Sequence, residues 1–400
     1  ARRALVIQYT MCVPSRFNGL SFASMIDVRR IDANDKPLNL EGTHIVYWMT
    51  SARRARWNHA LDHAIDLANE HNVPLIVVEC LALGHRWAND RIHTFVLQGM
   101  IDNRKLFEGS AVTYVPYVET SNEQAGGLLQ SFSRNAIAFV IDDYPTYMPR
   151  DVATRAKEIG ECSVRCVDSN GIIPIRAPER SFSTAYSFRR YIHQNVLSFL
   201  SDPPQSEPLK LLNDVPDGNQ IAIQCFEDAN VPLTPLEFIW RVSEASREGR
   251  EALEILDIDH DVPPIDDRRG GSVTARTELK KFIEHRLTSY HIDRNHPERH
   301  GGSGLSPWLH FGHISSFEIV HEVLESQRWN PMRITPPHNG RRAGWWGMTE
   351  GAEAFLDQVI TWRELGFVYC YEHPDHTSYE TLPEWAKNTL EEHSSDERPY

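Results

Sequence analysis

The sequence predicts an α/β domain of Rossmann type followed by an all-α domain. Short β-rich runs alternate with stretches of helical period up to residue 167, and prolines cluster between residues 203 and 264. After residue 270 the apolar residues recur with helical period alone. Because 400 residues are too many for one ordinary core, we expect two domains joined by a connector.

The composition is that of a globular protein. Hydrophobic residues make up 41% of the chain and charged residues 24%, which excludes a collagen, a simple coiled coil and wholesale disorder. The formal net charge of -14 opposes nonspecific adhesion to DNA or acidic membranes, although a local basic groove can exist on an acidic protein. Net charge therefore leaves a nucleic-acid partner open.

The sequence contains no membrane or metal signature. No run approaches the ~20 apolar residues of a spanning helix, and residues 1–11 lack the apolar core of a secretory signal, so we expect a cytoplasmic protein without a membrane partner. Cys162 and Cys166 are the only close cysteine pair, and no cysteine or histidine partner lies near them. Without an HExxH motif either, we predict no metal site.

The first part of the chain divides into an extension and the α/β domain. Residues 1–43 show no sustained period and are expected to form an N-terminal extension with a short strand over residues 4–7. The α/β domain is assigned to residues 44–175 and opens with the strand HIVYWM. Its further elements are a helix over 52–71, strands over 73–81, 112–118 and 136–141, and a helix over 152–159.

The rest of the chain is divided into a connector and a helical domain. Residues 176–270, with their clustered prolines, are assigned to the interdomain linker, and residues 271–400 to the helical domain. The α/β domain has no GxGxxG and no GxxxxGK[ST] motif, so neither a dinucleotide nor a P-loop triphosphate is predicted there in the usual way. A ligand at the carboxyl edge of the sheet stays possible.

A glycine- and serine-rich loop runs directly into a helix at GGSGLSPWLHFGHI, residues 301–314. Ser306 is placed as the N-cap and Pro307 in the first turn, and the free N–H groups of the turn suit a phosphate. Tyr290 and Arg294, just upstream, offer a second phosphate contact. The structural alternative is an ordinary capped helix with a solvated neighbour.

Aromatic and cationic residues gather near the end of the chain. On the helix predicted over 351–371, Gln358 and Trp362 fall on one face, and Trp362 could stack on a planar ligand. The alternative for Trp362 is a core tryptophan. Just before this helix, four residues combine positive charge and aromatic rings as DNA-binding surfaces do, although a packed loop is an equal alternative. These four residues are Arg341, Arg342, Trp345 and Trp346.

In this order the blocks resemble the photolyase and cryptochrome family, and most closely the class II cyclobutane pyrimidine dimer (deoxyribodipyrimidine) photolyases. The resembling segments are residues 47–61, 270–315 and 354–371, followed by LPEWAKNTL. The block GSGLSP followed by WRELG is far more specific in combination than either motif alone.

The resemblance implies an antenna-type α/β domain, a long linker and an all-helical domain that holds FAD. The implied enzyme is a monomeric carbon–carbon lyase that donates an electron from reduced flavin, under light, to a pyrimidine dimer flipped out of UV-damaged DNA. An antenna chromophore is also implied, and the sequence leaves a folate, a deazaflavin or an empty site open.

Site residues carry over from the family position by position. Tyr290, Gly304, Leu305 and Ser306 resemble the flavin phosphate contacts. His310 and Arg363 would line the same cavity, and Trp362 resembles the tryptophan against which the flipped dimer packs.

Two departures from the family pattern leave alternatives open. The dimer-repairing members carry a glutamate where this chain has Gln358, which donates hydrogen bonds but supplies no proton. A cryptochrome-like blue-light receptor without repair activity is therefore the alternative function. Family members also continue beyond the position of Tyr400, so residues 271–400 are expected to be the N-terminal part of the FAD-binding domain. A remnant that lacks flavin is a third alternative.

Overall fold

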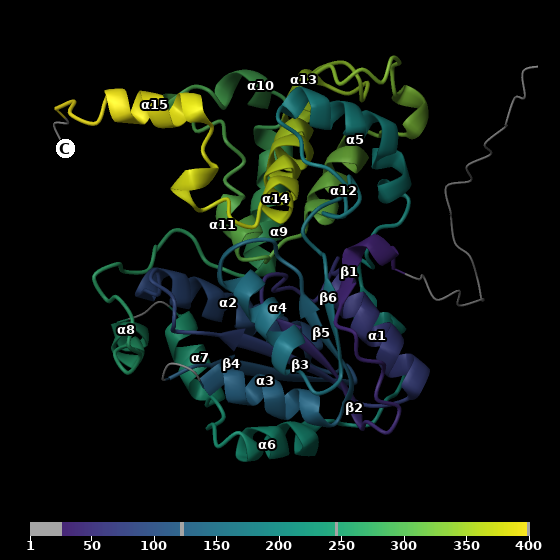
Figure 1. Ribbon diagram of the computed structural model, residues 1–400, viewed down its shortest axis with the longest axis vertical. Coiled ribbons are helices and arrows are strands. Elements are labelled where there is room, and N and C mark those ends of the chain that lie inside the picture. The colour runs from purple at the N-terminus through teal and green to yellow at the C-terminus, as the bar shows by residue number, and fades with distance from the viewer. Residues whose placement is uncertain (1–25, 121–123, 245–246, 398–400) are drawn as a thin grey trace, which may run out of the picture.

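The computed structural model describes residues 26–120, 124–244 and 247–397. A six-stranded sheet lies at the base of the molecule and a helical region lies above it (Figure 1). The strand order is β1-β6-β5-β2-β3-β4, and all neighbours run parallel except the pair β1 and β6. The strands are β1 (Ile31–Ala33), β2 (His44–Met49), β3 (Leu75–Leu81), β4 (Val112–Val118), β5 (Ala136–Asp142) and β6 (Ser163–Val167).

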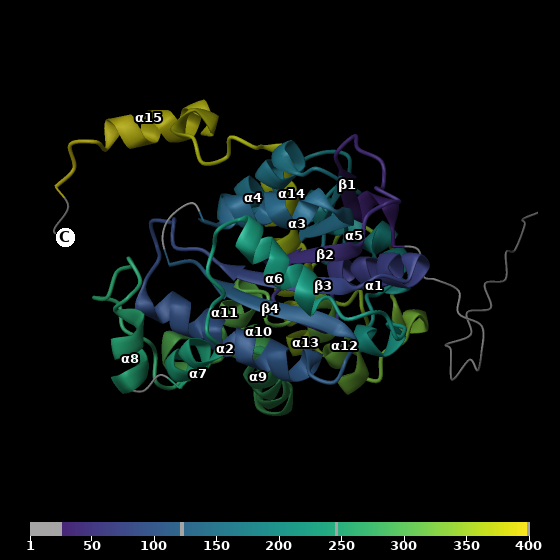
Figure 2. The ribbon, with the colours of Figure 1, turned by 90° about the horizontal axis from the view of Figure 1, so that it is seen from below.

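The predicted fold class is confirmed. Strands β2, β3 and β5 consist entirely of buried residues, as expected for parallel strands that are covered on both faces. Figure 2 shows α3, α4 and α6 on one side of the sheet and α2 on the other, while α1 packs with the α2 side. These helices are α1 (His59–His71), α2 (Asp90–Phe107), α3 (Gln124–Arg134), α4 (Tyr147–Ile159) and α6 (Asn219–Asp228).

Two local features at the start of the domain differ from the prediction. The first helix begins at His59 rather than at residue 52, because Asn58 caps it by accepting the N–H groups of Ala60 and Leu61. Within the predicted extension, β1 pairs antiparallel with β6 and widens the sheet by one edge strand. The strand predicted over residues 4–7 lies outside the described residues.

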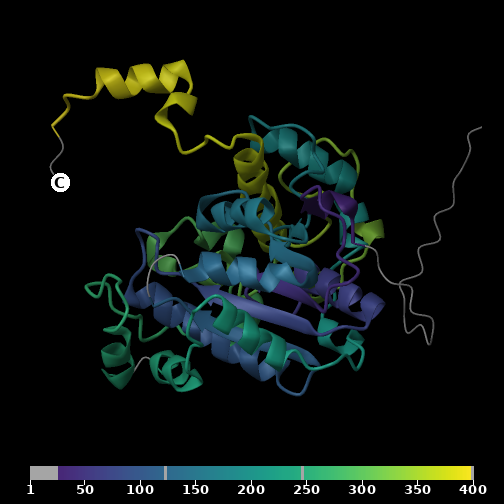
Figure 3. The ribbon, with the colours of Figure 1, turned by 60° about the horizontal axis from the view of Figure 1, so that its bottom comes forward.

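The segment 176–270, expected to be a connector, carries helices of its own. These are α5 (Ala185–Leu200), α6, α7 (Leu236–Ser243) and α8 (Arg247–Leu253). Helix α5 contributes Phe188 and Ile192 to the helical core, whereas α6 packs on α3 and α7 packs on α2. In Figure 3 the teal and green helices of residues 219–253 lie along the lower side of the sheet, whereas the helix of residues 185–200 lies above it with the helical region. The segment therefore wraps the α/β domain as well as leading away from it.

The helical domain is built around one core of aromatic side chains, among them Phe282, Trp308 and Phe355. Helix α15 extends away from the body and buries none of its residues (Figure 1). No helix among the described residues is long and apolar enough to cross a membrane. The helices are α9 (Ser272–His285), α10 (Tyr290–Asp293), α11 (Ser306–His310), α12 (Ser316–Ser326), α13 (Glu350–Leu356), α14 (Arg363–Glu372) and α15 (Glu384–Glu392).

A buried carboxylate joins the helical domain to the sheet. The Glu364 carboxylate on α14 accepts the backbone N–H groups of Ile172 and Ile173, at 2.7 and 2.9 Å, in the segment after β6. Burial raises the pKa of Glu364 to about 7, while the two N–H donors and the nearby Arg363 and Arg30 oppose that shift. A Cβ atom at Gly171 would lie 2.6 Å from the Glu364 carboxyl carbon, so only glycine permits this approach.

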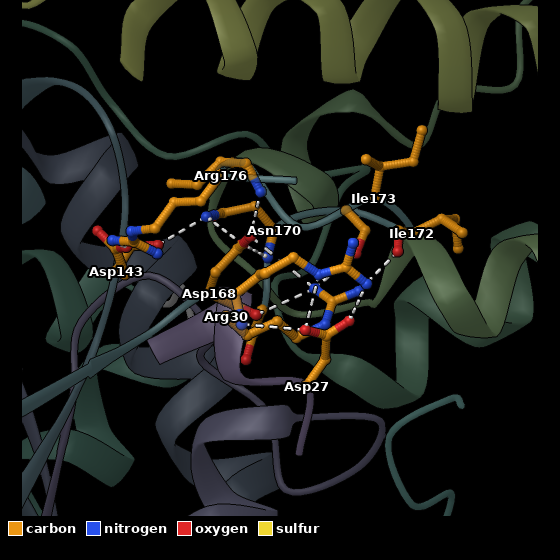
Figure 4. Close-up of polar contacts among 12 residues, drawn as sticks. Asp27, Arg30, Asp143, Asp168, Asn170, Ile172, Ile173 and Arg176 are labelled. Carbon is orange, nitrogen blue, oxygen red and sulfur yellow. Dashed lines mark hydrogen bonds and ion pairs between the residues drawn. The ribbon is translucent and has the colours of Figure 1, made fainter. Parts of the chain in front are cut away.

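The same segment is held from the other side by Arg30. Its guanidinium donates to the carbonyl oxygens of Asp168, Gly171 and Ile172 at 3.2, 3.1 and 2.6 Å. Figure 4 shows Arg30 pointing at this backbone, with Asn170 and Arg176 directed toward Asp143 on the far side. Residues 168–176 are therefore fixed by charged side chains from both domains.

A second buried carboxylate closes the carboxyl edge of the sheet. Strands β3 and β4 are added on one side of β2, and β5 and β6 on the other, so the strand order reverses between β2 and β5. This is the point where doubly wound sheets usually bind ligands. Here Asp142 Oδ2 accepts the N–H groups of Thr50, Ser51 and Ala52 at 2.8, 2.8 and 2.9 Å. Its Oδ1 accepts the Tyr47 hydroxyl at 2.7 Å. The chain thus supplies its own anion at this position.

The substitution Asp142→Ala should lower the free energy of unfolding by about 3–5 kcal/mol, because it leaves three buried N–H groups without an acceptor. Urea denaturation followed by far-UV circular dichroism measures this loss. Asp151→Ala, at an exposed position of α4, is the control and should change the free energy by less than about 0.5 kcal/mol. A loss of unfolding free energy below about 1 kcal/mol for Asp142→Ala would show that these hydrogen bonds to Asp142 do not stabilise the edge of the sheet.

Candidate functional site

A π-helical turn interrupts the helix that carries the two predicted catalytic residues. Residues Asp357–Trp362 form this turn, η5, between α13 and α14. The N–H group of Arg363 reaches the carbonyl oxygen of Gln358, five residues earlier, instead of the usual four. Single π-turns inside α-helices are rare and occur frequently at functional sites. The apolar period of the sequence gives no sign of this turn.

An ion pair fixes the start of the π-turn. Arg189 on α5 binds both oxygens of Asp357, with Nε to Oδ1 at 2.8 Å and Nη2 to Oδ2 at 3.2 Å. The Asp357 side chain is 4% exposed, and the exposed Arg342 brings its Nε to 3.8 Å from Oδ2. Sequence analysis missed Arg189 and Asp357, because their pairing across 168 positions has no local signal.

The two predicted catalytic residues lie on this turn with different exposure. Gln358 is partly buried, whereas Trp362 is 52% exposed. Trp362 is therefore not a core tryptophan, and its indole is open to a planar partner. The interpretation as a core residue, which burial statistics favour for an isolated tryptophan, does not describe this chain.

The glycine- and serine-rich loop before α11 has open backbone. Gly304 has a φ of +74°, and a Cβ atom at Gly304 or Gly302 would meet no atom within 4 Å among the described residues. Arg286 supports the loop by donating to the Gly302 carbonyl oxygen at 2.9 Å. A ligand can therefore approach this backbone closely.

The predicted N-cap at Ser306 is wrong by one residue. Leu305 occupies the N-cap position and Ser306 is the first residue of the helix. The Leu305 side chain is fully buried in the helical core, which fixes its backbone, while the Ser303 hydroxyl accepts the Leu305 N–H at 3.3 Å. Ser306 is exposed, so its hydroxyl is available at the surface of the loop.

Upstream of the loop, Tyr290 and Arg294 lie together. The Tyr290 ring is buried and packs edge-on against Phe282 and Phe355, and the Arg294 guanidinium carbon lies 5.5 Å from the ring centroid. The Nε atom of Arg294 is buried without a hydrogen-bond partner among the described residues. Tyr290 thus connects the loop region to α13, and Arg294 retains an unused donor.

Two further predicted cofactor residues lie on different helices, His310 at the end of α11 and Arg363 at the start of α14. His310 is exposed at the C-terminal end of α11, with its ring against Phe311. Arg363 donates to the carbonyl oxygen of Asn170 and lies over the ring of Phe367. The structure therefore brings Arg363 to the junction between the domains and not to the loop at 301–306.

The predicted DNA-binding cluster is mostly a packed loop. Trp345 is buried and stacks on His193 with ring centroids 4.0 Å apart, and Trp346 is buried beside it. Arg341 donates to the carbonyl oxygens of Thr335 and Gly344, which closes the loop. Of the four predicted residues, only Arg342 has a mostly exposed side chain.

No family model matches the chain. A deoxyribodipyrimidine photo-lyase of Methanothermobacter thermautotrophicus is 27% identical over 379 residues, which cover 94% of this chain and 72% of the relative. The corresponding enzyme of Arabidopsis thaliana is 26% identical over 91% of this chain and 66% of its own length. That of Potorous tridactylus is 24% identical over 93% and 62%.

Two solved structures share the fold. A class III photolyase from Agrobacterium tumefaciens superposes with a TM-score of 0.54 at 16% identity, over 87% of this chain and 64% of that chain. In sequence and in fold the chain is similar to members of the photolyase/cryptochrome family. A cryptochrome from Synechocystis superposes with a TM-score of 0.56 at 15% identity, over 83% and 62%. The chain thus spans roughly two thirds of the length of these family members.

Because His193 is buried, we predict that the protein loses stability as the pH falls. His193 accepts the Gly340 N–H through Nδ1, and burial together with Arg189 lowers the pKa of His193 to about 4. Because the unfolded chain takes up this proton near pH 6.5 and the folded chain only near pH 4, stability falls as the pH drops through that window. In His193→Gln, the loss of unfolding free energy between pH 7 and pH 5 should shrink by about 1–2 kcal/mol.

Urea denaturation at both pH values measures the difference. The control is His285→Gln, whose side chain is 72% exposed and which should keep the pH dependence of the parent chain. An equal pH dependence in His193→Gln and the parent chain would show that His193 does not contribute.

Proposed function

We propose that this protein is a FAD-dependent DNA photolyase that uses blue or near-ultraviolet light to split cyclobutane pyrimidine dimers in DNA. The observation that carries the proposal is the half-exposed Trp362 on the π-turn beside Gln358. These two residues belong to a chain that aligns over nine-tenths of its length with proteins named deoxyribodipyrimidine photo-lyase.

The loop at 301–306 fits the phosphates of FAD. Open space at Gly302 and Gly304 admits an anion to the backbone, and Ser306 presents its hydroxyl there. Arg294 would direct its unpartnered Nε donor to the same charge. Tyr290 would hold this region against α13, and Leu305 would anchor the loop in the core.

The π-turn would hold the lesion. FAD, when bound and reduced, supplies an electron on excitation by light. The Trp362 indole would pack against the flipped pyrimidines and replace the base stacking that they lose. The Gln358 amide would donate a hydrogen bond to a pyrimidine carbonyl oxygen. Arg342, with its exposed guanidinium, is the member of the basic cluster that we assign to a DNA phosphate.

The second candidate function is a cryptochrome-like receptor that responds to light without repairing DNA. Gln358 favours it, because an amide cannot transfer a proton to a reacting group. His310 and Arg363 remain proposed contacts of the flavin cavity. A folate or deazaflavin antenna in the α/β domain, DNA as partner and a monomeric state remain predictions as well.

A repair assay distinguishes the photolyase from the light receptor. The 400-residue chain, loaded with FAD and reduced, should restore the 260 nm absorbance of an oligonucleotide with one thymine dimer, in light only. In the dark, Trp362→Ala should weaken binding of that oligonucleotide about 10-fold, through the loss of one stacking contact, and Trp362→Phe should weaken it less. The control is Trp240→Ala, an exposed tryptophan on α7 that should leave binding unchanged.

A chain that binds and photoreduces FAD but leaves the dimer intact would reject the photolyase in favour of the receptor. Equal binding by Trp362→Ala and the parent chain would remove Trp362 from the lesion site.

The phosphate assignment can be tested without light. Arg294→Gln and Ser306→Ala should each weaken FAD binding about 10-fold in equilibrium dialysis, since each removes a phosphate contact. Riboflavin lacks phosphates, so its binding should not change. Lys281→Gln, an exposed charge on α9, controls for net charge. If FAD and riboflavin were weakened equally, these residues would shape the domain rather than bind phosphate.

A further inference from the structure

A large cavity lies on the α1 side of the α/β domain. Its volume is about 1160 Å³, and its walls come from α1, from residues 26–31 and from the segment 202–213. The short helix Pro208–Leu211 packs on α1 and forms one rim, and Figure 1 shows α1 lying close to β1. None of the predicted flavin or DNA residues is among the described residues that line it.

Two buried polar atoms in this wall lack partners among the described residues. Asp62 uses Oδ2 to accept the Gln205 N–H at 2.8 Å, but its Oδ1 is buried and unpaired. His59, with only 5% of its surface exposed, also has an unpaired Nε2. A buried polar atom without a partner costs about 1–3 kcal/mol, so a bound group that pairs with it gains a corresponding advantage.

The ionisable side chains of the lining are mostly acidic. The lining contains carboxyl groups from α1 and from both flanking segments, and one guanidinium of opposite charge. The carboxyl groups are Asp27, Asp62, Asp66, Glu70 and Asp202, and the guanidinium is that of Arg165. Of these, Asp27 is already bound by Arg29, and Arg165 lies 3.0 Å from His63 Nε2.

The histidines in the wall do not offset this charge. Burial, with Arg165 nearby, lowers the pKa of His63 to about 4, and burial with Arg30 and Arg54 lowers that of His59 well below its usual value. Burial raises the pKa of Asp62 well above its usual value, and burial with the neighbouring Glu70 raises that of Asp66 to about 6. At neutral pH the histidines are uncharged and Asp66 is ionised, so the cavity disfavours anions such as phosphate, and an ammonium group beside Asp62 would favour its ionised form.

The remaining wall is apolar, and this excludes a simple inorganic cation site. Six aliphatic side chains and two prolines line the cavity between the carboxyl groups. They are Ile26, Val28, Ile31, Ile65, Leu67, Leu211, Pro203 and Pro208. Among the described residues, no three metal-ligating side chains converge to hold an ion. A ligand that fits both the carboxyl groups and the apolar wall has a positive charge and an apolar body.

We propose that this cavity is a binding site for an organic cation, an amine carried on an aromatic or aliphatic body. The amine lies against Asp62 and Asp66 on α1, and donates to the unpaired Oδ1 of Asp62. The apolar body lies between Ile65 and the Pro203–Leu211 side of the cavity. This site is independent of the proposed flavin and lesion sites.

Three probes that share one ring system test the charge requirement. Tryptamine is a cation, tryptophol is its neutral analogue and indole-3-propionate is an anion. In isothermal titration with the 400-residue chain at pH 7.5, tryptamine should bind at least 10-fold more tightly than tryptophol. Indole-3-propionate should bind more weakly than either. Equal affinity for the three probes, or no binding of tryptamine at millimolar concentration, would overturn the proposal.

Two substitutions test the location. Asp62→Asn should weaken tryptamine binding about 10-fold and Asp66→Asn about 3- to 5-fold, with tryptophol unaffected by either. Since Asp62 is bonded to Gln205, circular dichroism checks its folding, and Asp66→Asn provides an independent result. The control is Asp151→Asn, which removes the same charge at an exposed position of α4. If Asp66→Asn and Asp151→Asn bound tryptamine alike, the amine would not lie in this cavity.

Discussion

The buried carboxylate of Glu364 sets the register between the helical domain and the sheet. It sits one residue beyond Arg363 on the helix that carries Gln358 and Trp362, and it accepts two backbone N–H groups from the segment that follows β6. Charge-assisted hydrogen bonds in a dry interior are strong and directional, so this contact fixes the helix in rotation as well as in position. The exposure of Trp362 is a consequence of that fixed rotation.

The sheet could be predicted from the sequence because its signal is local. The apolar runs HIVYWM and VTYVPYV coincide with β2 and β4, and parallel strands covered on both faces must be apolar throughout. The same reasoning found the glycine-rich loop and the aromatic helix. Local composition could not tell an exposed tryptophan from a buried one: Trp362 is open to solvent, whereas Trp345 is stacked on His193.

What the sequence could not predict depends on partners that lie far along the chain. The π-turn begins where Asp357 meets Arg189, and Arg363 turns to Asn170 because the helix is held against the segment after β6. Leu305 takes the N-cap position from Ser306 because its side chain is drawn into a core that exists only in the folded domain. Pairing of β1 with β6 likewise needs the finished sheet edge.

Asp142 gives the α/β domain a property that bears on how the protein is made. In many doubly wound folds the nest of N–H groups at the strand ends is satisfied by a phosphate that must arrive from solution. Here that role belongs to a side chain present from synthesis, which meets Thr50, Ser51 and Ala52 as soon as β2 and β5 pair. The sheet can therefore fold without binding a small molecule. In a newly made chain the helical domain can then pack against a sheet that is already folded.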